Sequence, residues 1–145
     1  MDETIIMERI RELIKTCPYI KNYAEGIGVD HLSEEPDCYA IESTPADPIL
    51  KRYINGATKR QQVFVFSSRE AYGADVRKNI ENLGFFQLFS SWLSKVSKTD
   101  NFIDIGDDKC PIKIETLTTG YAFDIGVSKA KYQIDCRLVY LQKGV

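Results

Sequence analysis

The fold is decided by residues 48–73, PILKRYINGATKRQQVFVFSSREAYG. Asn55-Gly56 lies between two runs: the apolar residues Ile49, Leu50, Tyr53 and Ile54 on one side, and the β-branched and aromatic run QVFVFS on the other. Asn-Gly supplies the positive φ angles that tight turns need, so the pair predicts a β-hairpin. Its loop either stops at Gly56 or extends through Ala57 and Thr58. The second run is apolar at consecutive positions, which predicts a central strand covered on both faces.

The same stretch is strongly basic. Residues 48–69 carry +5 with no acid while the whole chain carries −2, so the remainder carries −7. A basic arm on an acidic body predicts a surface that meets another subunit or a polyanion. The alternative is an exposed hairpin whose charges only protect a strand edge from aggregation. The basic residues are Lys51, Arg52, Lys59, Arg60 and Arg69.

Size and composition predict one domain, residues 1–145, because 43% of the 145 residues are hydrophobic and can form a core. The slightly acidic balance argues against nucleic-acid binding over the whole surface, but it allows a local basic patch. Charges interrupt the apolar positions near the N-terminus, so neither a signal peptide nor a membrane span is expected there. We therefore expect a cytoplasmic protein without a membrane partner.

Residue types that carry chemistry are sparse. The lone histidine, His31, lies in a polar segment, and no GxSxG, P-loop, GxGxxG or HExxH motif is present. The run that starts at Asp104, DIGDD, lacks the acid spacing of a calcium loop, and we interpret it as a solvated turn. We expect no enzyme activity, no cofactor and no metal. The four cysteines are Cys17, Cys38, Cys110 and Cys136. Their spacing does not fit a metal site, and we expect them to be reduced. A disulfide between Cys38 and Cys136 remains an alternative.

Helical periodicity predicts three helices. An amphipathic helix covers residues 4–16 and ends before Pro18. Two more cover residues 71–83 and 85–96, with a kink or break at Gly84 between them. Candidate N-caps for the second helix are Ser67 and Ser68.

Strands are predicted over residues 38–43, 112–118 and 121–125, and the longest over residues 131–142. Residues 19–36 are predicted to be irregular and polar. Alternation in the last strand places Tyr132, Ile134, Cys136, Leu138 and Tyr140 on one face. The order of elements predicts an α+β domain: an antiparallel or mixed sheet with a long basic β-hairpin, and helices packed on one face.

Two blocks of the sequence carry a resemblance. They are PILKRYINGATKRQQVFVFSSREAYGADVRKNIENLGFFQLFSSWL and KYQIDCRLVYLQKG. Together they resemble the minor capsid or tail-completion proteins of phages and prophages of Gram-positive bacteria. The resemblance covers about residues 4–144, apart from residues 19–36.

The resemblance implies a structural role as a tail terminator. Such a protein forms a ring, usually of six subunits, at the head-proximal end of the tail tube and joins it to the head connector. The implied partners are other copies of the chain, the tail tube protein, the head–tail connector protein and DNA passing through the ring. The implied location is the virion tail.

A ring is built from heterologous contacts, and a basic arm on an acidic body would supply complementary surfaces for them. Two alternatives remain: a head–tail connector or adaptor subunit, and a nucleic-acid-binding module that uses the basic hairpin. The second has less support, because the arm has a single aromatic residue and no interleaved stacking platform. Candidate interface residues are Lys51, Arg52, Tyr53, Lys59 and Arg60, with Asp104, Asp107 and Asp108 as candidate acidic partners.

Overall fold

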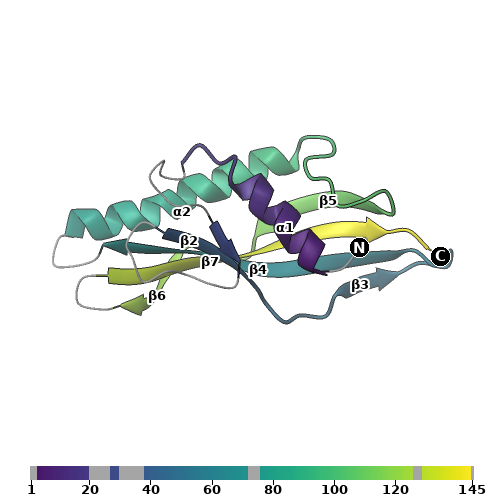
Figure 1. Ribbon diagram of the computed structural model, residues 1–145, viewed down its shortest axis with the longest axis horizontal. Coiled ribbons are helices and arrows are strands. Elements are labelled where there is room, and N and C mark those ends of the chain that lie inside the picture. The colour runs from purple at the N-terminus through teal and green to yellow at the C-terminus, as the bar shows by residue number, and fades with distance from the viewer. Residues whose placement is uncertain (1–2, 20–26, 30–37, 72–75, 126–128, 145) are drawn as a thin grey trace.

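The computed structural model describes residues 3–19, 27–29, 38–71, 76–125 and 129–144, which form an α+β fold (Figure 1). Within these ranges, two helices accompany one mixed sheet. The elements are α1 Glu3–Ile14, β1 Ile27–Val29, β2 Cys38–Ser43, β3 Ile49–Arg52, β4 Thr58–Ala71, α2 Val76–Ser97, β5 Lys109–Thr116, β6 Tyr121–Ile125 and β7 Lys129–Gln142.

The sheet is built on the antiparallel pair β4 and β7. Their register runs without a shift from Thr58 opposite Gln142 to Ala71 opposite Lys129. β2 and β3 pair with different parts of the free edge of β4, and β5 and β6 divide the free edge of β7 in the same way. β1 joins β2 in parallel, so the sheet is mixed. The predicted α+β class is confirmed.

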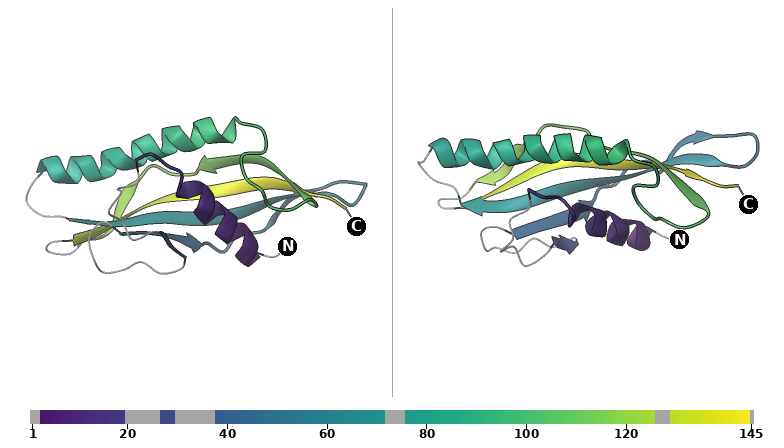
Figure 2. Two further views of the ribbon diagram at one scale, coloured as in Figure 1. Left: turned by 45° about the horizontal axis from the view of Figure 1, so that its top comes forward. Right: turned by 90° about the horizontal axis from the view of Figure 1, so that it is seen from above.

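One face of the sheet carries the core. Phe64 and Phe66 of β4 are fully buried, and the ring centroids of Phe66 and Phe89 of α2 lie 4.5 Å apart. The apolar stripe of α1 joins the same cluster through Ile10 and Ile14. Both helices therefore pack on one face, as predicted, with α2 running nearly along the strands and α1 obliquely across them (Figure 2).

β4 is a central strand, as predicted, but no helix among the described residues covers its opposite face, so the prediction of burial on both faces is wrong. Val63 and Val65 are only half-buried there. Long polar side chains from neighbouring strands lie on this face instead: Arg137 Nε donates to Glu115 Oε2 at 2.6 Å. Lys131 likewise pairs with a β2 carboxylate, 3.2 Å away.

α2 is one continuous helix, so the predicted start at residue 71 and the break at Gly84 are wrong. The helix passes through Gly84 because Phe86, Phe89 and Leu93 bind its second half to the core, whereas one glycine costs only about 1 kcal/mol relative to alanine. The predicted caps, Ser67 and Ser68, are instead buried inside β4.

Other boundaries follow the sequence pattern closely. β2 and β6 match their predicted limits, while β5 begins three residues early and runs through Pro111, which an edge strand tolerates. Within residues 19–36, β1 was not predicted, and His31 lies outside the described residues.

Cys136 is buried and free, and β4 separates β7 from β2, so the disulfide to Cys38 does not form.

No described helix combines the length and the apolar character needed to cross a membrane.

Two glycines provide opposite tests of this packing. A Cβ at Gly120 would lie 2.5 Å from Phe86 Cβ, which cannot move without displacing the core, whereas a Cβ at Gly84 would meet nothing within 4 Å. We expect Gly120→Ala to lower the free energy of unfolding by about 1–3 kcal/mol. Gly84→Ala should raise it by roughly 0.5–1 kcal/mol. Urea unfolding measures both changes, and a destabilised Gly84→Ala would contradict a straight α2.

Candidate interaction surface

The basic arm, residues 49–60, consists of β3, a five-residue turn and the first residues of β4. Tyr53 N donates to Ala57 O at 2.9 Å, and Ala57 N donates to Asn55 Oδ1 at 3.0 Å. Within the turn only Gly56 has a positive φ, of 90°. Asn55 thus acts through its side chain rather than through a left-handed backbone. Of the two loop lengths left open, the longer one is found, although Thr58 already belongs to β4.

The arm is part of the main sheet and not a free hairpin. β7 continues alongside β4 to the turn, with Lys59 opposite Leu141 and Thr58 opposite Gln142. Beyond β7, the chain presses against the turn so closely that a Cβ at Gly144 would lie 2.7 Å from Asn55 O. Figure 1 shows the C-terminus beside the arm. The strand order at this end of the sheet is β3, β4, β7, β5.

The cations of the arm occupy both faces of the sheet. Lys51 and Lys59 are directly opposite each other and therefore share one face, where two like charges destabilise the strand pair. Lys51 Nζ also lies 5.2 Å from the centroid of the Tyr53 ring. On the other face, Arg60 Nε donates to Thr58 Oγ1 at 2.9 Å, and Arg52 is opposite Thr58.

Among the described residues, the cations of the arm lack the carboxylate partners that cations elsewhere on the sheet have. Within the described ranges, none of Lys51, Arg52, Lys59 and Arg60 forms an ion pair with a carboxylate. In contrast, Lys113 and Arg137 of the sheet face both pair with Glu115. Lys51 and Arg52 are exposed and the other two are half-buried. The carboxylates of the described residues therefore leave the positive charge of the arm uncompensated.

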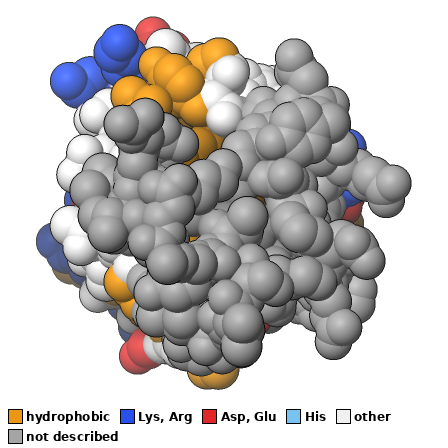
Figure 3. All heavy atoms as spheres, turned by 90° about the vertical axis from the view of Figure 1, so that its left-hand side faces the viewer, with side chains coloured by type: hydrophobic (Ala, Val, Ile, Leu, Met, Phe, Trp, Pro, Cys, Tyr) orange, Lys and Arg blue, Asp and Glu red, His pale blue; other side chains and the backbone are white. Residues whose placement is uncertain are grey.

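The five predicted interface residues are brought together by the fold. Arg69, which belongs to the same basic stretch of sequence, is not: it lies in the far half of β4, opposite Cys38 and Lys131. That opposite end of the molecule faces the viewer in Figure 3.

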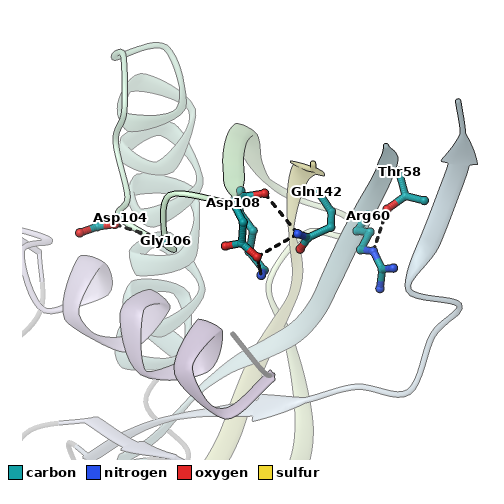
Figure 4. A network of polar contacts seen from close by, with 7 residues as sticks. Thr58, Arg60, Asp104, Gly106, Asp108 and Gln142 are labelled. Atoms are coloured by element: carbon teal, nitrogen blue, oxygen red, sulfur yellow. Dashed lines mark hydrogen bonds and ion pairs between the residues drawn. The ribbon is translucent and has the colours of Figure 1, made fainter. Parts of the chain in front are cut away.

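The predicted acidic partners lie on the loop between α2 and β5, at the other edge of the same end of the sheet (Figure 4). Asp108 is engaged within its own chain, because Gln142 Nε2 donates to its Oδ2 at 3.0 Å and Lys109 Nζ lies 3.1 Å away. Asp104 Oδ1 accepts from Gly106 N, and Asp107 is exposed. No cluster of three or more potential metal ligands occurs among the residues that the structure describes.

The sequence pattern missed the apolar character of the arm tip. The sequence pattern places Ile54 in an apolar strand run, yet its side chain is fully exposed, at 109%. Leu50 and Tyr53 are also exposed, at 41% and 38%. The available signal was the position of Ile54 directly before Asn55-Gly56, since a residue in a hairpin loop has no core to face.

No protein-family model matches the chain, and no curated protein matches it.

The hydrogen bond from Gln142, together with Lys109, lowers the pKa of Asp108 from 3.8 to about 2. Because the folded-state pKa lies below the unfolded value, this contact stabilises the fold fully above about pH 3.8 and is lost as the pH falls through about 2. We expect Gln142→Ala to raise the pKa of Asp108 toward 3.8, measured by NMR titration of the carboxyl carbon.

Asp107→Asn is the matched control for this contact, since Asp107 is one residue away and outside the hydrogen-bond network. Asp108→Asn should reduce the loss of stability between pH 5 and pH 2, and Asp107→Asn should leave the loss unchanged. Equal behaviour of the two variants would contradict the assignment.

Proposed function

We propose that this chain is a structural subunit of a phage-type tail, acting as a tail terminator. It would form a ring at the head-proximal end of the tail tube and join the tube to the head connector, without catalytic turnover. The single observation that carries the proposal is the arm, where exposed and half-buried cations lack carboxylate partners among the described residues. The sequence resemblance supports the choice of assembly.

The proposed partners are other copies of the chain, the tail tube protein and the head–tail connector protein, in the virion tail. A charge surplus held on paired strands of the main sheet suits contacts of this kind, because charges across an interface fix register and partner choice more than they add affinity. DNA passing through such a ring would meet the same cations.

A nucleic-acid-binding module is the second candidate, favoured by the same charge surplus. One observation weighs against it as the main role. The arm has one aromatic ring, Tyr53, and Lys51 Nζ already lies over that ring, so no open stacking platform for bases exists on the arm.

Reversing the arm charge tests the proposal. We expect the wild-type protein to reach about six times the 16.5 kDa chain mass by light scattering, with rings in negative-stain images. Lys51→Glu/Arg52→Glu should lower this mass toward that of one chain, because the reversed arm would repel an acidic surface of the next copy. The control Arg9→Glu/Lys95→Glu changes the net charge equally at two exposed helix positions and should keep the assembly.

Two results would count against the proposed role. One is a wild-type chain that stays monomeric both alone and with assembled tail tubes. The other is an arm variant that assembles normally but loses a DNA affinity that falls steeply with salt, which would favour the nucleic-acid-binding module.

A further inference from the structure

The tip of the arm forms an apolar knob. Tyr53 and Ile54 are exposed side by side in a turn that main-chain and Asn55 hydrogen bonds hold in place. Leu50 adds a third exposed apolar side chain on β3. Burial of such side chains is the dominant favourable term in most protein associations. An apolar knob that hydrogen bonds hold in place beside the exposed cations Lys51 and Arg52 is therefore a surface suited to a partner.

The opposite edge of the sheet contains two adjoining hollows, of about 440 and 270 Å³, which we call the loop hollows. They lie between the α2–β5 loop and β5 and share Asn101 and Pro111 in their linings. The lining of the larger hollow is mostly polar, and half-buried Phe102 and exposed Ile112 supply its apolar surface. Three exposed carboxylates contribute to the linings: Asp100, Asp104 and Asp107.

Two cations also line the loop hollows. The side chain of Lys109 is only 4% exposed, and its ammonium group is paired with Asp108 at 3.1 Å. Lys98 is exposed and lines the larger hollow. The exposed charges of the loop hollows therefore sum to a negative surface, whereas the knob lies beside a positive one.

The knob and the loop hollows of one copy are separated by the sheet itself. With the strand order β3, β4, β7, β5, three strand spacings, or about 14 Å, lie between β3 and β5. A contact between knob and hollow must therefore join two copies. Since the two surfaces differ, the contact is heterologous and runs head to tail, which closes into a ring when the rotation between copies allows it.

We propose that the Tyr53–Ile54 knob of one copy inserts into the loop hollows of a second copy, with Lys51 and Arg52 facing the carboxylates of Asp100, Asp104 and Asp107. Burial of Tyr53 and Ile54 against Phe102 and Ile112 contributes to the affinity, and the charges select the partner surface and its register. This contact rests on the proposed self-assembly and names the two surfaces that would build it.

Cys110 allows a direct test, because its thiol is exposed and lines the larger hollow. In Ile54→Cys, oxidation with diamide should join position 54 of one copy to Cys110 of the next and give a ladder of covalent oligomers. A disulfide needs Cα atoms within about 7 Å, so the strand spacing excludes this bond within one copy. Peptide mapping by mass spectrometry identifies the bond, and Ile54→Cys/Cys110→Ser should give no ladder.

The outcomes separate this contact from the proposed function. Wild-type rings without a bond from position 54 to Cys110 would overturn the contact and leave the ring. A bond only between two copies of position 54 would show paired tips and also overturn it. A chain that is monomeric under every condition, with no cross-link, would overturn both proposals.

A charge exchange provides the second test. Lys51→Glu/Arg52→Glu and Asp104→Lys/Asp107→Lys should each weaken self-association at least about tenfold. Mixing the two variants should restore assembly, because every knob then meets a loop hollow of opposite charge. Failure of the mixture to assemble would overturn the contact.

The apolar part of the contact is tested by Ile54→Ser, which should also weaken self-association about tenfold. Unchanged self-association together with a loss of vesicle or nucleic-acid binding would overturn the contact and assign the knob to a membrane or a nucleic acid instead.

Discussion

The fourteen-residue pairing between β4 and β7 is the constraint on which the rest of the structure depends. Four further strands take their register directly from one member of this pair. The pair also fixes which side chains face the helices, because a shift of one residue would turn Phe64, Phe66 and their partners to the opposite face. Core and arm are therefore specified together: the ladder that ends at Thr58 and Gln142 is the one that buries Cys136 and Leu138.

The middle of this ladder and its end at the arm have different surroundings. In the middle of the sheet, α1 and α2 cover the core face and bury a stack of aromatic rings, including Tyr39 against Phe66 at 5.7 Å. At the other end, the strands of the arm extend past the helices (Figure 2). The arm gains its order from pairing with β7 and from the close approach of Gly144, rather than from a core of its own. Its outward side chains are thus available for partners.

The parts of the fold that the sequence predicts well are those set by alternation along one strand. In β7, the alternation correctly places every second residue from Tyr132 to Tyr140 on the buried face. The pattern along this one strand is enough to tell its two faces apart. Prediction fails where distant contacts override local preference. Ser67 and Ser68 resemble helix caps, but β7 holds them in a strand, and the core holds α2 straight through Gly84. Charge counting similarly located the arm, but only the fold separates Arg69 from it and binds Asp108 to Gln142.

The two edges of the arm end also differ in how they can meet another molecule. β5 is poorly suited to strand addition, since Pro111 has no N–H to donate and Ile114 N already donates to Ser97 Oγ at 3.0 Å. A partner at this edge must therefore make contact mainly through side chains and through the loop beside it. At the β3 edge, two copies of the same basic strand would repel each other. Both features disfavour a symmetric contact between two like edges and favour a head-to-tail contact between two unlike edges.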